Sequence, residues 1–371
     1  MNKRILVLTN YYMGLYSFRK EVIEALLNEG YEVYISCPIV DESEKQKSEW
    51  FEDLGCKIIE TPFKRKGTNP FKDVKLVLRY RKIIKKVKPL VVLSYTIKPN
   101  LYGGMACQLT GVPQIVNITG LGSAVENPGW LQKLTVILYR IGLRKTKIVF
   151  FQNRANMAFC DTHKMIRGNK ALIPGSGVNL DYHSFKDYPA NGTIKFIFIS
   201  RLLKEKGVEE YFGAAIRIRQ QYPNTEFHVV GPCEDAYEEQ LRQLDNNGIV
   251  IYHGLQADVR PYIGEAHCTI HPSYYPEGMS NVLLESCAAG RPIITTNRPG
   301  CGEIVEDGKT GFLVNAKDVD DLVSVIERFI ALPYQQKIQL GINARKKMER
   351  EFDRQLVVDA YLREIESINK L

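Results

Sequence analysis

The segment 271–290, HPSYYPEGMSNVLLESCAAG, has the composition of a strand end, a polar loop and the first turns of a helix. Ser280 or Asn281 is a residue type that commonly begins a helix. Gly278 lets the loop backbone approach a ligand closely because it has no Cβ. The N–H groups that follow a helix start lack partners within the helix and bind anions, diphosphates among them. Here those groups belong to the backbone of Met279, Ser280, Asn281 and Val282.

Two acidic side chains flank this predicted anion site. Glu285 lies four residues after Asn281, one helical turn further on and on the same side, where its carboxylate can bind a vicinal diol. Glu277 lies in the loop and can reach a second hydroxylated group. Hydroxyl groups at both ends of a ligand, with a diphosphate between them, are the chemistry of a nucleotide-sugar. The alternative is a capped helix beside an ordinary surface acid.

A second charged segment, SRLLKEKG at 200–207, follows a predicted strand. Arg201 and Lys206 bracket the predicted turn into a helix, where cations can neutralise a departing diphosphate. Basic residues are common in turns, so this segment is informative only together with the acidic one. The single Asp-x-Asp run, Asp318-Val319-Asp320, lies at a predicted helix start, which favours capping over metal binding. We therefore expect neither a metal ion nor a cofactor.

The elements that must position these residues alternate between strand-like and helix-like segments. In the first half, the apolar runs that predict strands are 4–10, 31–37, 56–61, 90–95, 113–118 and 147–152. The amphipathic stretches between them, which predict helices, are 15–28, 43–54, 70–87, 100–109, 130–143 and 153–163. After a polar linker at 181–193 the pattern restarts, with strands at 194–200, 226–230, 249–252, 268–271, 292–295 and 311–314. Such alternation predicts parallel β-α-β units with right-handed crossovers. We predict an α/β fold class with two doubly wound, Rossmann-like domains facing a cleft, and a site at the carboxyl ends of the strands.

Composition and charge narrow the class of protein. The chain has 371 residues, 44% of them apolar, and no apolar run approaches the about 18 residues of a membrane-spanning helix. Without a signal-peptide pattern we expect it to stay in the cytoplasm. Residues 64–88 carry eleven basic side chains and one acid, Asp73, which favours an anionic membrane surface as partner. No nucleic-acid-binding signature accompanies the charge, so nucleic acid is not expected. The alternative is a solvated helix face.

Taken together, the motifs resemble those of the retaining glycosyltransferases of family four, which have the GT-B fold. The resemblance is strongest from 196 to 314, where the matching residues are Arg201, Lys206-Gly207, Gly254, Pro276-Glu277-Gly278, Glu285, Pro299-Gly300, Gly308 and Gly311. Two N-terminal segments, SYTIKPNLYG at 94–103 and ITGLG at 118–122, look like the branch that builds capsule, O-antigen and exopolysaccharide on undecaprenyl diphosphate.

The resemblance implies a metal-independent, retaining transfer of a hexose or N-acetylhexosamine from a UDP-sugar to an undecaprenyl-diphosphate-linked saccharide. It makes Arg201 and Lys206 ligands of the donor diphosphate and Glu277 a ligand of the transferred sugar, the three catalytic candidates. Glu285 would hold the ribose hydroxyls, and Gly14, in the turn after the first strand, would face the donor phosphates. The implied donor-binding residues are Gly14, Gly254, Leu255, Gly278, Met279, Ser280, Asn281, Val282 and Glu285.

For the acceptor, the candidates are Lys98, Asn100, Thr119 and Gly120. Many relatives have a histidine after the fifth N-terminal strand; this chain reads Asn-Ile-Thr-Gly at 117–120, so Thr119 or the backbone of Gly120 would substitute. Lys98 and the cluster at 64–66 are the candidates for binding the acceptor diphosphate and the membrane surface, with a solvated patch as alternative.

The expected domains follow from these assignments. Residues 1–185 form the acceptor-binding domain, 186–355 the nucleotide-sugar-binding domain, and 356–371 a C-terminal helix that packs back on the first domain. The region 64–88 would hold the protein peripherally at the inner face of the plasma membrane.

Three other classes compete with this interpretation. A UDP-sugar 2-epimerase shares the two-domain architecture and would act without an acceptor. An NAD-dependent dehydrogenase is disfavoured because no Gly-x-Gly-x-x-Gly follows a strand: Gly120-Leu121-Gly122 leads into Ser-Ala-Val. A non-catalytic sugar-binding protein fits the fold but not the diphosphate-binding cations.

Overall fold

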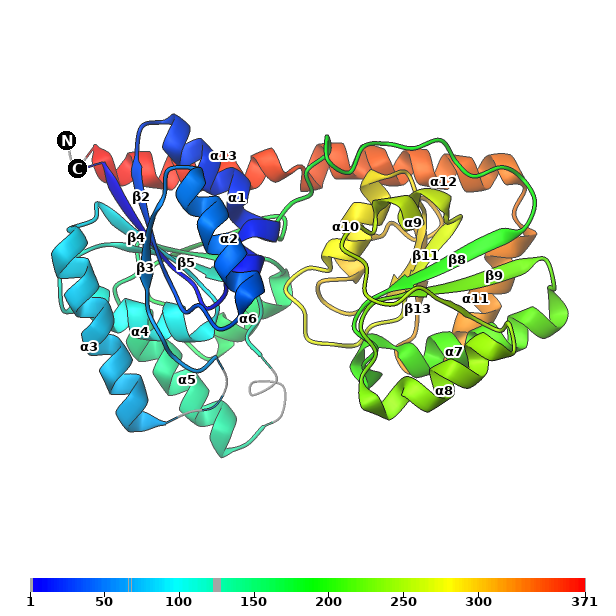
Figure 1. Ribbon diagram of the computed structural model, residues 1–371, viewed down its shortest axis with the longest axis horizontal. Coiled ribbons are helices and arrows are strands. Elements are labelled where there is room, and N and C mark those ends of the chain that lie inside the picture. Colours follow the sequence, from blue (N-terminus) through cyan, green and yellow to red (C-terminus); the bar gives the residue numbers. More distant parts are fainter. Residues whose placement is uncertain (1–2, 66, 68, 123–127, 371) are drawn as a thin grey trace. The chain divides into compact units, whose positions relative to one another are not determined.

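Figure 1 shows the computed structural model of the chain, which describes residues 3–65, 67, 69–122 and 128–370. Its internal contacts divide the chain into two compact units. Unit 1 contains the residues up to Ser176 together with the C-terminal segment from Arg354, and unit 2 is Gly177–Asp353. The C-terminal segment therefore belongs with the N-terminal half of the chain, although unit 2 separates them in sequence.

Unit 1 is built on one parallel sheet in the order β3-β2-β1-β4-β5-β6-β7. The strands are β1 Arg4–Leu8, β2 Glu32–Cys37, β3 Lys57–Glu60, β4 Val91–Tyr95, β5 Gln114–Ile118, β6 Ile148–Phe151 and β7 Asn169–Leu172. The strand order reverses between β1 and β4, where a doubly wound sheet offers a ligand site beyond its carboxyl ends.

Helices cover both faces of this sheet (Figure 1). They are α1 Tyr12–Asn28, α2 Glu42–Asp53, α3 Pro70–Val87, α4 Ile97–Gln108, α5 Trp130–Gly142, α6 Arg154–Thr162 and α13 Arg354–Asn369. Because side chains alternate along a strand, Ile5 and Val7 of β1 pack in the layer of α1, α2 and α13. Leu6 and Leu8 pack in the layer of α3, α4, α5 and α6.

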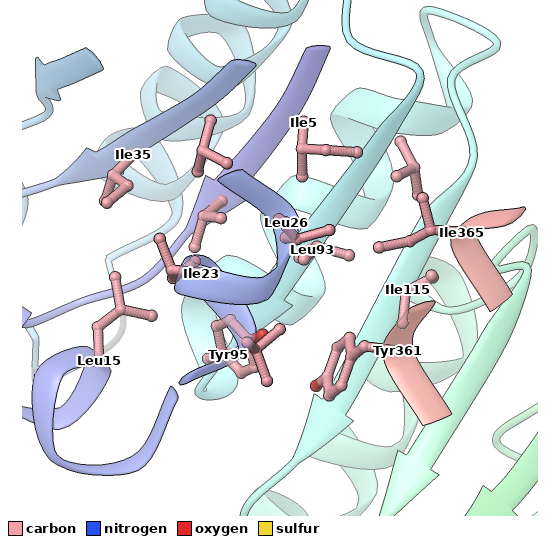
Figure 2. Packing of buried hydrophobic residues seen from close by; sticks show 14 of the residues in the cluster. Ile5, Leu15, Ile23, Leu26, Ile35, Leu93, Tyr95, Ile115, Tyr361 and Ile365 are labelled. Atoms are coloured by element: carbon pink, nitrogen blue, oxygen red, sulfur yellow. The ribbon is translucent and has the colours of Figure 1, made fainter. Parts of the chain in front are cut away.

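Figure 2 shows how α13 completes the first of these layers. Tyr361 and Ile365 of α13 lie beside Ile115 of β5 and Leu26 of α1, and all four are buried in one cluster. The C-terminal helix is thus part of the core of unit 1.

Unit 2 repeats the architecture with a parallel sheet in the order β10-β9-β8-β11-β12-β13. Its strands are β8 Ile194–Ile199, β9 Thr225–Val230, β10 Ile251–Tyr252, β11 Cys268–His271, β12 Ile293–Thr296 and β13 Gly311–Val314. Its helices are η2 Lys204–Lys206, α7 Val208–Gln221, α8 Asp235–Asn246, α9 Arg260–Glu265, α10 Asn281–Ala288, η3 Gly302–Ile304, α11 Val319–Ala331, α12 Tyr334–Lys347 and η4 Met348–Phe352. Helices α7, α8 and α11 share one core cluster with the sheet, and α10 and α12 share another.

The predicted α/β class with two doubly wound domains is confirmed. Helices α1 and α4 begin one turn earlier than predicted. In neither does the side chain of the residue before the helix cap its start, so no local signal marks the true beginning, and Pro99 is tolerated in the first turn of α4. Strand β7 is not among the predicted strands, because it is a short edge strand with mostly exposed residues and so gives no apolar pattern.

The segment 181–193, predicted as a linker, packs on unit 2 instead. The Tyr188 hydroxyl donates to the His267 carbonyl at 2.7 Å, and the Arg291 guanidinium donates to the carbonyls of Lys186 and Asp187 at 3.1 and 2.7 Å. The division between the units therefore falls after Ser176, before the boundary predicted at 185. No helix within the described residues is long and apolar enough to cross a bilayer.

Candidate active site

All of the predicted donor residues except Gly14 belong to unit 2, at or near the carboxyl edge of its sheet. At this edge the Ser200 N–H donates to the Val230 carbonyl at 3.0 Å, and the Gly231 N–H donates to the Gly254 carbonyl at 2.9 Å. The ends of β8, β9 and β10 are thereby joined through their backbones. Arg201, which follows Ser200, and Gly254 consequently lie along one edge with the end of β11.

Lys206 and Glu277 form an ion pair at this edge. Lys206 ends the short 3₁₀ helix η2, and Glu277 lies in the loop after β11; both side chains are mostly buried. The Lys206 ammonium also lies 4.8 Å from the centre of the Tyr275 ring, and Ser273 Oγ donates to Glu277 Oε1 at 3.4 Å. A cation and a carboxylate held together in this way offer a donor for phosphate oxygens beside an acceptor for hydroxyl groups.

Gly207 makes this pairing possible. It has φ +80°, and a Cβ built on it would lie 2.4 Å from the Pro272 carbonyl oxygen, well inside van der Waals contact. Only glycine lets the turn after η2 approach the loop after β11 so closely. The Lys206-Gly207 pair in the sequence is therefore one structural unit.

His271, the last residue of β11, faces the same carboxylate. Its Nε2 lies 3.6 Å from Glu277 Oε1, and its side chain is buried. Burial lowers the pKa of His271 below its usual value, so the ring is neutral at neutral pH. Burial acts to raise the pKa of Glu277, but His271 and Lys206 together outweigh it and lower that pKa to about 2. Glu277 is therefore a carboxylate throughout the physiological range.

This depressed pKa predicts how stability depends on pH. The ordinary pKa is 4.5, so the stabilisation from ionised Glu277 is complete above pH 4.5 and is lost as pH falls towards about 2. We expect wild-type stability to fall more steeply over this window than that of Glu277→Gln, measured by urea unfolding followed with far-UV circular dichroism. Glu205→Gln, on the exposed side of η2, should keep the wild-type slope. Equal slopes for wild type and Glu277→Gln would contradict the assignment.

The start of α10 lies beside this pair. The Ser280 N–H donates to the Gly300 carbonyl at 2.8 Å, which holds the Pro299-Gly300 loop against the helix start. The Ser280 side chain makes no capping hydrogen bond, and Asn281 Oδ1 is buried with no hydrogen-bond partner among the described residues. Gly278, Met279 and Ser280 are buried, so the helix start is shielded from bulk water.

Glu285 lies one turn into α10. It faces His183, a residue that the sequence analysis does not identify. His183 Nε2 lies 4.0 Å from Glu285 Oε1, with both side chains partly exposed. His183 comes from the segment predicted as a linker, and nothing in its local sequence marks it. The remaining candidates lie at the surface: Arg201 is exposed, and so is Leu255, the residue after Gly254.

The Asp-x-Asp run caps a helix, as predicted. Asp318 accepts a hydrogen bond from the Asp321 N–H at 2.9 Å at the start of α11. Asp320 forms an ion pair with Arg217 of α7. Both carboxylates are thus engaged in the fold of unit 2.

Comparisons with known proteins agree with this geometry. Residues 183–347 match the family model "Glycosyl transferases group 1", and residues 4–153 match "Glycosyl transferase 4-like". The chain is a group 1 glycosyltransferase with the GT-B fold. The two matches together span most of both units, so the family assignment does not rest on the donor motifs alone.

Two curated relatives align over most of their length. An N,N'-diacetylbacillosaminyl-diphospho-undecaprenol alpha-1,3-N-acetylgalactosaminyltransferase of Campylobacter jejuni is 24% identical over 94% of this chain and 95% of its own. The capsular polysaccharide biosynthesis glycosyltransferase CapM of Staphylococcus aureus is 26% identical over 77% of this chain and 79% of its own.

Solved structures share the fold. A glycosyltransferase of Rickettsia africae superimposes with a TM-score of 0.82 at 19% identity, covering 100% of this chain and 99% of that one. HepE of Anabaena, solved in complex with UDP and glucose, gives 0.78 at 17% identity over 100% of both chains.

In unit 1 of the glycosyltransferase, Gly14 lies in the first turn of helix α1 rather than in a turn before it. The start of this helix is already occupied by a carboxylate of the protein: Glu44, which is buried, accepts from the N–H groups of Tyr12 and Met13 at 2.5 and 3.4 Å. Glu44 is itself paired with Arg65 at 3.2 Å. The N–H groups of Tyr12 and Met13 are therefore committed to the fold, which corrects the prediction of a turn open to phosphate.

The acceptor candidates lie in three kinds of environment. Asn100 is buried, accepts from Ser94 Oγ at 2.8 Å and donates to the Asn117 carbonyl at 2.9 Å, so it holds the strand ends together rather than facing an acceptor. Thr119 and Gly120 follow β5 and are partly exposed. Lys98 pairs with Asp73 at 3.4 Å, with both side chains largely buried.

Lys98 and Lys64, which are far apart in sequence, line the same cavity of about 570 Å³. It opens at the carboxyl ends of β2 and β3 and has both apolar and basic walls. Its other lining residues include Ile39, Phe63, Leu76, Lys72, Lys75 and Arg79. Lys66 of the predicted cluster lies outside the described residues.

Proposed function

We propose that this glycosyltransferase moves a hexose or N-acetylhexosamine from a UDP-sugar to a saccharide on a polyprenyl diphosphate, in the assembly of a bacterial surface polysaccharide. The observation that carries the proposal is the buried Lys206–Glu277 pair beside the start of α10, which Ser280 does not cap with its side chain. The names of the relatives support the two substrates: UDP and glucose are bound by HepE, and the Campylobacter enzyme is named for an undecaprenol-diphosphate substrate.

Each part of the nucleotide-sugar donor then has protein groups that bind it. Lys206, Arg201 and the N–H groups of Met279, Asn281 and Val282 bind the diphosphate, as charge and helix polarity favour, while the Ser280 N–H stays bonded to the Gly300 carbonyl. Glu277 accepts hydrogen bonds from the transferred sugar, and Glu285 from the ribose. Gly254 and Leu255 would lie near the base.

The reaction we propose retains the configuration at the anomeric carbon and uses neither a metal ion nor a cofactor. The bond from that carbon to the diphosphate oxygen breaks, and a bond to the acceptor hydroxyl oxygen forms on the same face. The hydroxyl proton passes to the released diphosphate. The protein contributes positioning and fixed charges aimed at the departing diphosphate, which are large terms in many enzymes.

The acceptor would bind unit 1. Its diphosphate fits the cavity lined by Lys98 and Lys64, whose apolar walls suit the first isoprene units. Thr119 and Gly120 would lie beside the acceptor sugar. The basic stretch 64–88 would hold the enzyme peripherally at the cytoplasmic face of the membrane through anionic headgroups.

The test is turnover of a panel of UDP- and GDP-sugars with a short-chain polyprenyl-diphosphate-sugar acceptor, with and without EDTA. We expect transfer from one UDP-sugar, unchanged by EDTA and lost in Glu285→Ala. Loss of activity in EDTA would contradict the metal-independent reaction. Interconversion of the UDP-sugar without acceptor would identify an epimerase, and the absence of any UDP or GDP binding would remove the donor site.

Lys98 gives a separate prediction about the acceptor. Lys98→Met keeps much of the apolar stem and removes the charge, so we expect the acceptor KM to rise about tenfold while the donor KM stays constant, as for loss of one charge-assisted contact. Lys45→Ala, an exposed lysine of α2 outside both the cavity and the basic stretch 64–88, is the control and should leave both constants unchanged. An unchanged acceptor KM in Lys98→Met would exclude Lys98 from the acceptor site.

A further inference from the structure

Helix α5 of unit 1 carries an apolar stripe on its exposed side. Trp130, Leu134, Ile137 and Ile141 recur at the spacing of one helix face, and all are exposed; Trp130 is 76% exposed. Leu131 widens the stripe at its first turn and is exposed as well. A contiguous apolar helix face left in water is an interaction site rather than a chance feature.

The opposite face of α5 is fixed to the protein. Val136 and Tyr139 are buried in the core layer of α3, α4, α5 and α6. Gln108 Nε2 of α4 donates to the carbonyls of Ile141 and Gly142 at 2.7 and 3.0 Å. A Cβ on Gly104 would lie 2.1 Å from the Gly142 carbonyl oxygen, so α4 and α5 touch through their backbones. Helix α5 is therefore held against α4 and the core of unit 1, while its apolar stripe is exposed.

Helix α3, on the other side of α4 in the same layer, has a similar stripe. Phe71, Val74 and Leu78 are exposed at helical spacing, and Phe71 is 89% exposed. Two helices of one layer thus each leave an apolar stripe without an intramolecular partner among the described residues.

The charges in the region that contains both stripes are mostly positive. The hundred residues from 61 to 160 contain eighteen lysines and arginines and two acids, Asp73 and Glu126. On α5 and in the turn after it, Lys133, Arg140, Arg144 and Lys145 are exposed. Exposed apolar residues flanked by cations are typical of helices that lie in the headgroup region of anionic membranes.

We propose that α5 inserts its apolar stripe into the interface of an anionic bilayer, with the α3 stripe, on the other side of α4, as a second contact, so that the membrane is bound by apolar burial as well as by charge. Trp130 lies at the N-terminal end of the α5 stripe, and tryptophan is a side chain that favours the membrane–water interface. Helix α5 has 13 residues, about 20 Å, too short to span a bilayer but long enough to lie along its surface. A second copy of the chain fits less well, because two such faces would bring their cations together. This inference adds a membrane contact to the proposed enzyme. It rests on the proposed function in one respect: a membrane-linked acceptor gives the enzyme a reason to bind the bilayer.

Trp130 provides the probe for the test. The chain has two tryptophans, and Trp50 is packed against Tyr16 and Phe51 with ring centres 4.9 and 5.0 Å away. Trp50→Phe leaves Trp130 as the only tryptophan. With vesicles of phosphatidylglycerol and phosphatidylethanolamine that contain no acceptor, we expect its emission to shift to shorter wavelength and to be quenched by lipids brominated near the headgroup.

Ile137→Ser and Ile141→Ser, made in this background, should each weaken vesicle binding about tenfold, because each removes most of one buried apolar side chain. Leu356→Ser, on the exposed side of α13, is the matched control and should bind as the parent does. Vesicle binding without a shift or quenching of Trp130 emission, or variants that bind equally well, would overturn the proposal. Self-association in sedimentation equilibrium that Ile137→Ser abolishes would instead assign the stripe to a dimer.

Transfer to a short-chain, water-soluble acceptor separates this inference from the proposed function. If Ile137→Ser keeps that transfer and loses vesicle binding, both stand. If the parent chain transfers the sugar and does not insert, the membrane inference alone fails. If it inserts and transfers nothing, the proposed function alone fails.

Discussion

Replacement of Lys206 by alanine is expected to lower kcat/KM for the donor by about 10²–10³, the usual effect of removing one group that stabilises developing charge. Two effects act together. The departing diphosphate loses a fixed cation, and Glu277 keeps a buried carboxylate whose ion-pair partner is gone. The second effect raises the pKa of Glu277 and disturbs the sugar contact as well. The measurement is steady-state transfer with the donor identified by the sugar panel.

Lys204→Ala is the matched control for this substitution. Lys204 lies in the same 3₁₀ helix, is exposed, and pairs with Glu209 at 3.2 Å away from Glu277. It should keep activity within about twofold, as expected for an exposed ion pair. Because Lys206 and Glu277 act as a unit, the double variant Lys206→Ala with Glu277→Gln should lose much less than the product of the two single losses. Multiplying losses would show that the two residues act independently.

The sequence predicts the fold well where apolar periodicity is strong. Strand β11 and helix α3 begin and end at the predicted residues, because an apolar run and a capped amphipathic pattern leave few alternatives. Prediction from the sequence fails where the local signals for a strand or a helix start are weak or absent. Strand β7 is short and exposed, and the residues that precede α1 and α4 do not cap them with their own side chains. Residues 181–193 look like a linker because their contacts with Arg291 and His267 are hydrogen bonds between a side chain and a backbone carbonyl far away in sequence, which no local pattern reveals.

The site was predictable to the extent that its residues are close in sequence. The loop with Glu277 and the helix start at Asn281 form one segment, and their joint placement follows from it. Contacts between segments that are distant in sequence could not be predicted. Nothing local shows that His183 faces Glu285, that Glu44 occupies the start of α1, or that Lys64 and Lys98 share a cavity. The prediction for Asn100 failed because a polar residue in a motif can serve the fold as well as a ligand.

Replacement of Tyr361 by alanine is expected to destabilise unit 1 by about 3–5 kcal/mol, the usual cost of deleting a large buried aromatic side chain. The ring is buried between Phe150 at 5.0 Å and Tyr95 at 6.1 Å, and its hydroxyl accepts from Asn117 Nδ2 at 3.0 Å. Such a loss is a large part of the about 5–15 kcal/mol that stabilises a domain. Tyr361→Phe keeps the ring and should cost only about 1 kcal/mol.

Both tryptophans, Trp50 and Trp130, belong to unit 1, so urea unfolding followed by tryptophan fluorescence reports on that unit, while UDP binding reports on unit 2. We expect the fluorescence midpoint of Tyr361→Ala to fall and UDP binding to persist at urea concentrations where unit 1 is unfolded. Leu356→Ala, on the exposed side of the same helix, should leave the midpoint unchanged. An unchanged midpoint in Tyr361→Ala would mean that α13 does not complete the core of unit 1 in solution, and that the last helix of the chain is dispensable for the domain on which we place the acceptor.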